Sequence, residues 1–385
     1  MQPRFAEKLL KQYSRQFRSL AVVGPRQSGK TTLVKKVFPS KPYVSLEDPD
    51  ERLLAATDPR AFLTRFKNGA ILDEAQRAPE LFSYLQGILD KTKKDGLFIL
   101  TGSNNFLLQE SVSQTLAGRI GYIDLLPLCY KEIIQFDKKK FYTGELIWKG
   151  CYPEIFDKNR KPAAWYPSYI RTYIERDVKQ ISNIGNSLLF NRFMQLCAGR
   201  TGQQLNVAAL SNECGVNIKT VQAWLSILQS SYIIYLLPSY HKTYNKRVVK
   251  TPKLYFLDTG LACSLLGIRQ ENEIANSHFR GALFENFILL EILKQKYNSG
   301  SAATLYYWKE NNGLEIDILI DTGKKIIPVE IKMAETFTTG HIKNIRHWNK
   351  LANNTGGYLL YDGDKQLNLT DKIIVSNWRN NNLKF

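Results

Sequence analysis

The segment Gly24–Thr31 has the residue types and spacing of a phosphate-binding loop. It fits the pattern G-x-x-x-x-G-K-[ST] without exception, and it lies between an apolar run that ends at Val23 and a segment of helical periodicity. Backbone N–H groups in such a loop hold negative charge, Lys30 is expected to reach the β- and γ-phosphates of a nucleotide, and Thr31 is expected to bind Mg²⁺. The predicted nucleotide-binding residues are Gly24, Pro25, Arg26, Gln27, Ser28, Gly29, Lys30, Thr31 and Thr32.

A second element belongs to the same chemistry. The sequence Ala70-Ile71-Leu72-Asp73-Glu74 is an apolar run that ends in two acids, which is typical of a Walker B strand. Asp73 is expected to hold Mg²⁺ together with Thr31, and Glu74 to orient and deprotonate the attacking water. Acids also cap helices, so this pattern is weak alone and gains its meaning from the preceding loop. The adjacent Glu74 favours hydrolysis over nucleotide binding alone.

Three further residues complete the predicted catalytic set with Lys30 and Glu74. Ser103 and Asn104 follow the apolar run Leu97–Leu100, where a polar side chain could sense the γ-phosphate or could simply cap a turn. Arg119 precedes another apolar run and could act as an arginine finger for a neighbouring subunit, which would imply a ring or dimer. A structural role is the alternative for Arg119.

The last third of the chain carries separated carboxylates beside a lysine. Glu285 lies in a segment of helical pattern, Asp317 within GLEIDILI, and Glu330 and Lys332 within IIPVEIK. A turn at Thr322–Lys325 would pair the last two segments as a hairpin. Two carboxylates beside a lysine can hold Mg²⁺ and activate water against a phosphodiester. The alternative is the ordinary alternation of charge on exposed strands.

The middle of the chain has the spacing of a helix-turn-helix. Val207–Asn212 would be the first helix, Ile218–Leu228 the second, and the apolar SSYIIYLL a wing. DNA contact and protein docking are both open for this unit, because the second helix holds one basic residue. The polar residues expected to face outward are Asn217, Lys219, Thr220, Gln222 and Ser226. The better nucleic-acid candidate is the basic and aromatic stretch formed by Tyr240, Lys242, Tyr244, Lys246, Arg247, Lys250 and Lys253.

The elements that must position these residues follow from the apolar pattern. Short apolar runs separated by helix-length segments predict a parallel sheet covered by helices in the first third. The predicted strands there are Ser19–Val23, Tyr43–Leu46, Ala70–Leu72, Leu97–Leu100 and Tyr122–Leu125. The last third predicts helix Phe284–Gln295, strands Leu305–Trp308, Leu314–Ile320 and Ile326–Ile331, helix His341–Leu351 and strand Tyr358–Tyr361. Helices are also expected over Trp165–Ile181 and Leu188–Leu196.

Composition limits the classes of protein. The chain has 385 residues, 44% of them hydrophobic and 23% charged, which excludes a disordered or collagen-like chain. No apolar run is long enough for a membrane helix, the amino terminus does not resemble a secretory signal, and the five cysteines are widely separated, so we expect a cytoplasmic location. The net charge is +18, and residues 126–275 hold 20 basic and 11 acidic residues. This excess favours a polyanionic partner, although a solvated surface would have the same composition.

Taken together, these motifs resemble a known prokaryotic family, the predicted AAA+-type ATPases with an uncharacterised carboxy-terminal domain. The segments that carry the resemblance are GPRQSGKTTL, ILDEAQ, LTGSN, LAGRI, YIERDV, PKLYFLDTGLA, GALFENFI and the EID/VEIK pair. The resemblance implies an α/β protein with a P-loop ATPase core at residues 1–126, a helical lid at 127–200, a winged helix at 201–252 and a PD-(D/E)xK nuclease-like domain at 253–385. The proline that precedes the aspartate in that nuclease pattern is replaced by Ile316. In YIERDV, an ion pair involving Arg176 and Asp177 would hold the helical lid together. Alternatively, Arg176 would sense the nucleotide.

The sequence therefore predicts a Mg²⁺-dependent ATPase that binds and hydrolyses ATP and acts as a switch on or near DNA. ATP is favoured over GTP because the sequence has no guanine-reading Asn-Lys-x-Asp. Two alternatives stay open. One is an ATP-gated DNA nuclease that cuts with Glu285, Asp317, Glu330 and Lys332, and the other is a nucleotide-dependent signalling module that binds protein. A homo-oligomer is compatible with each of them.

Overall fold

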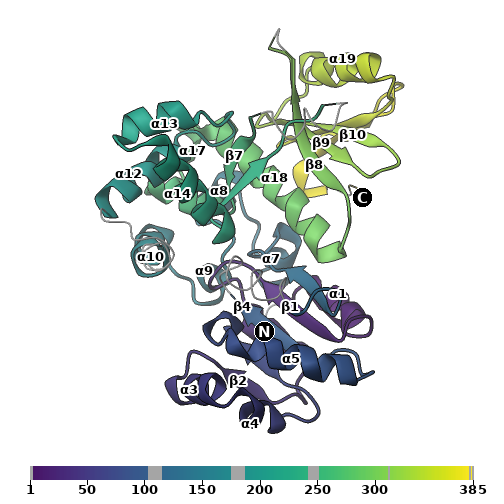
Figure 1. The fold of residues 1–385 in the computed structure, drawn as a ribbon. Helices are drawn as coiled ribbons and strands as arrows, with labels where there is room; N and C mark the ends of the chain where they lie inside the picture. The colour runs from purple at the N-terminus through teal and green to yellow at the C-terminus, as the bar shows by residue number, and fades with distance from the viewer. Residues whose placement is uncertain are drawn as a thin grey trace.

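The computed structural model describes residues 3–102, 115–174, 187–241, 251–310, 313–380 and 383. Figure 1 shows a first α/β part around β1 and β4, a helical part around α12–α14, and a second sheet part around β8–β10. Long helix α18 (Arg280–Ser299) runs from the second sheet toward the first part. The mixed α/β architecture that the sequence predicts is confirmed.

The first sheet is parallel, with strand order β2-β3-β4-β1-β5. Its strands are β1 (Ser19–Val23), β2 (Tyr43–Ser45), β3 (Ile71–Asp73), β4 (Phe98–Gly102) and β5 (Ile120–Asp124). Every residue of β1, β3 and β4 is buried, because helices cover both faces of this sheet. The five predicted strands are present, and their ends agree with the prediction to within two residues.

Alternate residues of β1 separate the two hydrophobic clusters that hold this part together. Leu20 and Val22 contact the cluster under α1 (Ala6–Tyr13) and α2 (Lys30–Val37). Ala21 and Val23 face the opposite cluster, to which the other helices contribute. Those helices are α3 (Pro49–Thr57), α4 (Pro59–Thr64) and α5 (Glu80–Lys91), with the short 3₁₀ turn η1 (Ala75–Arg77) before α5.

The next part consists of short helices with an aromatic core. Its elements are α7 (Tyr130–Phe136), α8 (Thr143–Lys149), α9 (Pro153–Asp157), α10 (Pro162–Tyr169) and the π-helical η2 (Ile170–Ile174). Trp165 stacks on Tyr169 with ring centroids 5.0 Å apart, and Tyr152 contacts both rings. Residues 175–181 of the helix predicted over Trp165–Ile181 lie outside the described residues.

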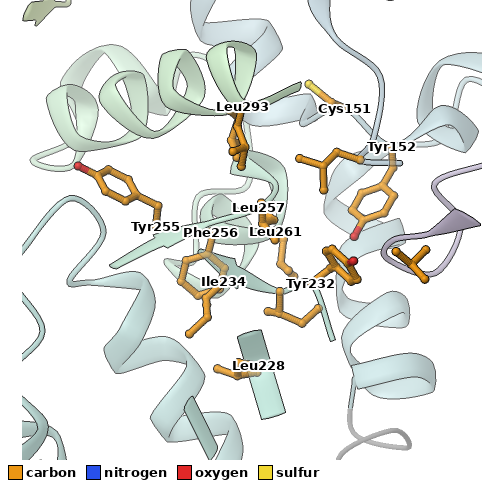
Figure 2. Packing of buried hydrophobic residues seen from close by; sticks show 14 of the residues in the cluster. Cys151, Tyr152, Leu228, Tyr232, Ile234, Tyr255, Phe256, Leu257, Leu261 and Leu293 are labelled. Atoms are coloured by element: carbon orange, nitrogen blue, oxygen red, sulfur yellow. The ribbon is translucent and has the colours of Figure 1, made fainter. Parts of the chain in front are cut away.

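The two helices predicted in the middle of the chain are present and are joined by a short turn. Helix α12 (Ser187–Ala198) precedes α13 (Val207–Cys214) and α14 (Ile218–Ser230), and Gly215 ends α13 in a left-handed conformation with φ 72°. Strands β6 (Ile234–Leu237) and β7 (Lys253–Phe256) then pair antiparallel, followed by α16 (Thr259–Leu265) and α17 (Glu273–Asn276). Figure 2 shows Phe256 of β7, Leu261 of α16 and Leu293 of α18 within one buried cluster, which joins this part to the carboxy-terminal one.

The carboxy-terminal part is α18 and a six-stranded sheet of order β12-β13-β11-β10-β9-β8. After α18 come β8 (Thr304–Lys309), β9 (Glu315–Asp321), β10 (Ile326–Lys332), η3 (Thr339–Ile342), α19 (Lys343–Ala352), β11 (Gly357–Tyr361), β12 (Leu367–Asn368), β13 (Ile373–Asn377) and η4 (Trp378–Asn380). The predicted order of helix, three strands, helix and strand is present, and β9 and β10 form the expected hairpin. Strands β12 and β13 were not predicted from the sequence.

All five cysteines are buried and free of disulfides. Within the described part of the chain, no helix combines the length and the apolar character that a membrane span requires.

Candidate nucleotide site and carboxy-terminal cluster

The glycine-rich loop occupies the position that a phosphate-binding loop requires, between the carboxyl end of β1 and the first turn of α2. Gly24 has a φ of 148°, and a Cβ there would lie 2.2 Å from the carbonyl oxygen of Leu125. Gly29 has a φ of 91° at the N-cap of α2, a conformation that side-chain-bearing residues rarely adopt. These two glycines are therefore needed for the backbone path of the loop.

The side chains of the loop are arranged to receive an anion. The Lys30 ammonium is buried and donates to the carbonyl oxygens of Gly24, at 2.9 Å, and Pro25, at 2.8 Å. The Ser28 hydroxyl is fully buried and finds no hydrogen-bond partner among the described residues. A buried cation beside an unsatisfied hydroxyl and the start of a helix fits the charge and hydrogen-bonding needs of a phosphate.

The remaining predicted loop residues surround this cradle. Gln27 adopts a left-handed backbone conformation with φ 61°. The Arg26 guanidinium lies 4.0 Å from the Glu47 carboxylate, and its backbone carbonyl accepts a bond of 3.4 Å from Tyr169 of α10. Thr32 lies in the first turn of α2 and lines a small cavity beside the loop.

The two predicted magnesium-binding residues lie together. The Thr31 hydroxyl donates to the Asp73 carboxylate, 2.9 Å from Oδ1 and 3.1 Å from Oδ2. Asp73 ends β3, and its side chain is largely buried. Carboxylate and hydroxyl oxygens are ligands that Mg²⁺ accepts, so this pair fits a magnesium ion carried by a nucleotide.

Two residues that the sequence analysis did not assign also contact Asp73. The Tyr43 hydroxyl, at the start of β2, donates to Asp73 Oδ2 at 2.8 Å, and the Thr101 hydroxyl near the end of β4 donates to Oδ1. Burial, followed by the hydrogen bond and the negative charge of Asp73, raises the pKa of Tyr43 to about 12. Thr101 had a usable signal, because parallel strands end at the same edge of a sheet, whereas Tyr43 could not be placed without the register.

Glu74 follows Asp73 in a left-handed conformation, with φ 54° and ψ 45°. This conformation turns the chain away from the strand direction immediately after Asp73. The Glu74 carboxylate accepts a bond of 2.5 Å from the side-chain amide of Gln76. Its predicted role as general base stays a prediction.

The other predicted catalytic residues are Ser103, Asn104 and Arg119, and the structure describes only the last of them. Ser103 and Asn104 lie outside the described residues. Arg119 precedes β5 beside Ser19, at the opposite end of the sheet from the glycine-rich loop, and it pairs with Asp90 at 2.5 and 3.1 Å. Because a five-residue strand spans roughly 15 Å, Arg119 cannot reach a phosphate in its own chain. An arginine finger that acts on a neighbouring subunit stays a prediction.

A buried arginine before the first helix supports the loop from behind. Arg4 donates to the carbonyl oxygens of Ser28, at 2.7 Å, and Leu126, at 2.6 Å, and it lies 3.3 Å from the Glu132 carboxylate. Glu132 is fully buried and also accepts bonds from the N–H groups of Phe5 and Cys129. No motif marks Arg4, because its partners are 24 to 128 residues away in sequence.

The predicted carboxy-terminal residues also come together. Asp317 on β9 and Glu330 on β10 both contact Lys332, whose ammonium lies 3.5 Å from Asp317 and 2.9 Å from Glu330. The N–H of Ile331 donates to Asp317 at 2.8 Å. Burial and then the charge of Asp317 raise the pKa of Glu330 well above its ordinary value. Burial acts to lower the pKa of Lys332, but the two carboxylates outweigh it and raise that pKa.

Glu285 joins this cluster through Lys253, a residue that the sequence pattern predicts to lie on a nucleic-acid surface. It is bound by the Lys253 ammonium at 3.1 Å and by the Tyr255 hydroxyl, and burial followed by the charge of Asp317 raises its pKa. Lys253 also pairs with Glu315. Within the part of the chain that the structure describes, no group of three or more acids, histidines or cysteines has the geometry to hold a metal ion.

The expectation that Lys253 and Tyr240 form part of a nucleic-acid surface is wrong. Lys253 is 2% exposed and is held by carboxylates, and Tyr240 is 8% exposed and packs against Tyr306 and Trp348. Burial in the carboxy-terminal part removes both side chains from any ligand surface. The other members of that stretch, Lys242, Tyr244, Lys246, Arg247 and Lys250, and also Arg176 and Asp177 of the lid, lie outside the described residues.

The outward face of α14 is polar and is explained in part by local structure. Asn217 caps the helix by accepting from the Thr220 N–H at 2.8 Å, and the Thr220 hydroxyl donates to the same oxygen. Lys219, Gln222 and Ser226 are exposed, and the Ser226 hydroxyl bonds the Gln222 carbonyl. The capping role of Asn217 accounts for its residue type without any ligand.

A glycine-rich loop between a parallel strand and a helix, with Thr31 against an aspartate at the end of a neighbouring strand, is the arrangement of a P-loop ATPase domain. Residues 16–134 match the family model described as an AAA domain. Residues 142–272 and 280–380 match two models described as domains of unknown function, DUF8612 and DUF4143.

Relatives with similar sequence cover most of the chain. An uncharacterized protein of Mycobacterium bovis is 29% identical over 320 residues, which are 82% of this chain and 70% of that protein. An uncharacterized protein of Methanocaldococcus jannaschii is 25% identical over 361 residues, or 84% of this chain and 76% of that protein.

Two solved structures were also found by comparison. The Walker-type ATPase PABY2304 of Pyrococcus abyssi has a TM-score of 0.47 and 14% identity, with 68% of this chain and 94% of that chain covered. The AMPPCP-bound DnaA of Aquifex aeolicus has a TM-score of 0.31 and 11% identity, with 58% of this chain and 85% of that chain covered.

Proposed function

We propose that this protein is a Mg²⁺-dependent ATPase that uses ATP binding and hydrolysis as a switch acting on or near DNA. The observation that carries the ATPase is the joint geometry of Lys30 in the loop and of Thr31 against Asp73. This geometry would bind the phosphates and their metal ion next to each other, at the carboxyl edge of the first sheet.

Binding would exchange internal hydrogen bonds for bonds to the nucleotide. The Lys30 ammonium would leave the carbonyls of Gly24 and Pro25 for the β- and γ-phosphate oxygens, and the Ser28 hydroxyl would gain a partner. Thr31 and Asp73 would hold the magnesium ion, which supplies positive charge near the transferring phosphate. Tyr43 and Thr101 position the Asp73 carboxylate from the two neighbouring strands.

Hydrolysis would depend on Glu74 as the group that orients water and accepts its proton. The Gln76 amide holds this carboxylate, and the Gln76 side-chain oxygen is buried without a partner among the described residues. An ionised carboxylate accepts several hydrogen bonds, so Glu74 can keep the bond from Gln76 while it positions a water. The left-handed backbone at Glu74 aims its side chain differently from a continued strand.

The switch is supported by contacts that tie the loop to the rest of the chain. Tyr169 of α10 bonds the Arg26 carbonyl, and Arg4 bonds the Ser28 carbonyl while holding Glu132 of α7. The start of α7 is in turn bound by α18, because the Tyr130 N–H donates to Glu291 at 2.9 Å. A movement of the loop on binding nucleotide would pull on both elements.

Turnover of ATP by wild type, Lys30→Ala and Glu74→Gln tests the ATPase. We expect Lys30→Ala to lose nucleotide binding and Glu74→Gln to bind ATP with turnover reduced by about a hundred-fold or more. The exposed Glu80→Gln on α5 is the matched control and should keep wild-type turnover. Equal rates in all four proteins would refute the proposal.

The DNA part of the proposal is supported by the net charge of +18 and the helix-turn-helix geometry of α13 and α14. Binding to duplex DNA should weaken steeply as salt rises, because phosphate contacts release counterions. The exposed Lys219→Glu on α14 should weaken it further, whereas Lys67→Glu, exposed on the first part, should have no effect. Salt-independent binding or no binding would favour the alternative of a protein-binding signalling module.

A second candidate activity, an ATP-gated DNA nuclease, is favoured by the Asp317–Lys332–Glu330 cluster and by Glu285 beside it. The element order of the carboxy-terminal part is that of PD-(D/E)xK nucleases. Plasmid and single-stranded DNA incubated with protein, ATP and Mg²⁺ or Mn²⁺ test this activity. Cleavage must disappear in Asp317→Ala. If the wild-type protein does not cleave DNA, the cluster has a structural role only.

A further inference from the structure

The carboxy-terminal carboxylates share their surroundings with three lysines. Each of four acids is contacted by a lysine ammonium; the acids are Glu285, Glu315, Asp317 and Glu330, and the lysines are Lys253, Lys309 and Lys332. The side chains of Lys309 and Lys332 are 39% and 37% exposed, whereas that of Lys253 is 3% exposed. Lys253 is therefore the interior cation of this cluster.

Lys253 reaches the cluster from another part of the chain. It is the first residue of β7, which pairs with β6 shortly after α14. Its ammonium lies 3.1 Å from Glu285 of α18 and also contacts Glu315 of β9. Burial acts to lower the pKa of Lys253, but the charges of Glu285, Asp317 and Glu315 outweigh it and raise that pKa. The lysine therefore stays charged and acts on three of the four acids.

Strand β7 is fixed on α18 by further contacts (Figure 1). The Asn286 side chain accepts from the Phe256 N–H at 2.9 Å and donates to the Phe256 carbonyl at 2.7 Å. The Tyr255 hydroxyl donates to Glu285, and both Asn286 and Tyr255 are fully buried. Because Lys253 is buried as well, its ammonium can leave the acids only if β7 moves away from α18.

One carboxylate oxygen of the cluster is left without a partner. Glu330 is 1% exposed, and its Oε1 is buried and accepts no hydrogen bond from the described residues. A divalent cation would satisfy such an oxygen, because carboxylates are ligands that Mg²⁺ and Mn²⁺ accept. The neighbouring acids cannot gather around a metal ion while they hold ammonium groups. This agrees with the geometry, since within the described ranges no three such side chains are arranged to hold a metal.

We propose that Lys253 takes the place of a divalent cation and keeps the carboxylate cluster closed to metal while β7 is docked on α18. Loss of the lysine would open a site for Mg²⁺ or Mn²⁺ at Glu285, Asp317 and Glu330. The proposal rests on the nuclease candidate for the choice of these ligands. It adds that a metal-dependent reaction at the cluster is blocked until β7 moves.

Binding of Mn²⁺ to the full chain, followed by electron paramagnetic resonance of the free ion, tests the proposal. Every protein carries Asp73→Asn, so that the proposed nucleotide site loses its metal ligand. Lys253→Met removes the ammonium and keeps an unbranched side chain, and it should bind one Mn²⁺ about ten-fold or more tightly than the parent that retains Lys253. Adding Asp317→Asn to Lys253→Met should abolish this gain. Equal affinity with and without Lys253 would overturn the proposal.

Two controls separate removal of this lysine from a general loss of positive charge. Lys253→Arg keeps a cation at the same position and should bind Mn²⁺ no more tightly than the parent. Lys309→Met removes a more exposed cation that lies 3.2 Å from Glu315, and it should change the affinity less than about three-fold. A gain in Lys309→Met as large as that in Lys253→Met would show an effect of charge alone and would contradict a site closed by Lys253.

Unfolding in urea provides a second measurement, because Lys253→Met is also expected to be less stable. A ligand that binds only the folded state stabilises it, so Mn²⁺ should raise the unfolding midpoint of Lys253→Met and leave that of Lys253→Met with Asp317→Asn unchanged. Lys253→Gln, whose amide can still donate to Glu285, is measured in parallel and should show the same response. Midpoints of both Lys253 variants that do not respond to Mn²⁺ would refute the site.

Incubation of the same variants with plasmid DNA and Mn²⁺ distinguishes this proposal from the nuclease candidate. Tighter Mn²⁺ binding by Lys253→Met without cleavage would support the closed cation site and refute the nuclease. Tighter binding together with cleavage that the parent lacks would support both. Cleavage by the parent at the same rate as by Lys253→Met would show that the lysine does not block the cluster and would overturn the proposal.

Discussion

Arg4 gives the most direct test of how the glycine-rich loop is held. Replacing it by alanine removes charge-assisted bonds to the carbonyls of Ser28 and Leu126 and the ion pair with Glu132. Glu132 is fully buried but keeps bonds from two backbone N–H groups, of 2.7 Å from Phe5 and 2.9 Å from Cys129. Glu132 would therefore stay partly satisfied, which limits the loss.

The magnitude follows from these partners. A hydrogen bond to a charged group contributes about 1.5–3 kcal/mol, and breaking a buried ion pair costs about 3–5 kcal/mol. Because the contributions overlap and Glu132 retains two donors, we expect Arg4→Ala to lower the local stability of the loop by about 3 kcal/mol. A loss of this size makes amide exchange about a hundred-fold faster where exchange occurs by local opening.

Hydrogen exchange measured by mass spectrometry on peptides covering the loop and α7 is the assay. Arg4→Lys should give an intermediate effect, since an ammonium cannot serve both carbonyls and Glu132 with the geometry of a guanidinium. Arg60→Ala on α4, where the arginine is exposed, is the control. Loop exchange in Arg4→Ala within three-fold of wild type would show that the loop does not depend on this residue.

The other predictions concern Asp73 and the carboxy-terminal cluster. Tyr43→Phe removes one hydrogen bond to Asp73 and should raise the Mg²⁺ concentration that gives half-maximal ATPase activity about five-fold. Tyr84→Phe, at an exposed position, is the control and should have no effect. An unchanged magnesium dependence in Tyr43→Phe would contradict the positioning role. Lys253→Met removes the cation that pairs with half-buried Glu285, whereas Glu315 keeps its ion pair with Lys309. We expect the carboxy-terminal part to lose about 1.5–3 kcal/mol in urea unfolding, and a loss smaller than about 0.5 kcal/mol would argue against a structural pair. Burial raises the pKa of Glu330 in the folded state above its value in the unfolded chain. The contribution of Glu330 to the free energy of unfolding should therefore fall as pH rises from about 4.5 toward neutrality. Glu330→Gln should reduce the slope of stability against pH, and parallel curves for the two proteins would exclude the shift.

The sequence predicts the parts of the nucleotide site that depend on local chemistry. Lys30, Thr31 and Asp73 lie in two segments with a recognisable pattern, and a parallel sheet brings the ends of such segments to one edge. Their contact therefore follows from the motif and the fold class together. Tyr43 contacts the same carboxylate, but β2 is three residues long and nothing in its sequence indicates its register with β3.

Residues that act across long separations could not be found in this way. Arg4 and Glu132 are 128 residues apart, and neither lies in a patterned segment. Lys253 shows the opposite error, since a lysine among basic and aromatic neighbours indicates a surface, whereas the fold buries it against Glu285 and Glu315. Strand β12 escaped prediction because a pair of residues is too short to show alternation.

Helix α18 carries Glu285 of the carboxy-terminal cluster and also contacts α7, which Arg4 connects to the glycine-rich loop. Glu285 belongs to the carboxy-terminal cluster, whereas Glu291 and Lys294 bind the Tyr130 N–H and the Leu128 carbonyl at the start of α7. Five residues, all of them buried, lie between Glu285 and Glu291, and the helix rises about 9 Å from one to the other. A helix packed on both sides moves as a unit, so a displacement of α7 by the nucleotide loop would shift Glu285 relative to Asp317 on β9. If the nucleotide loop moves α7, α18 would therefore transmit that movement to the carboxylate cluster directly.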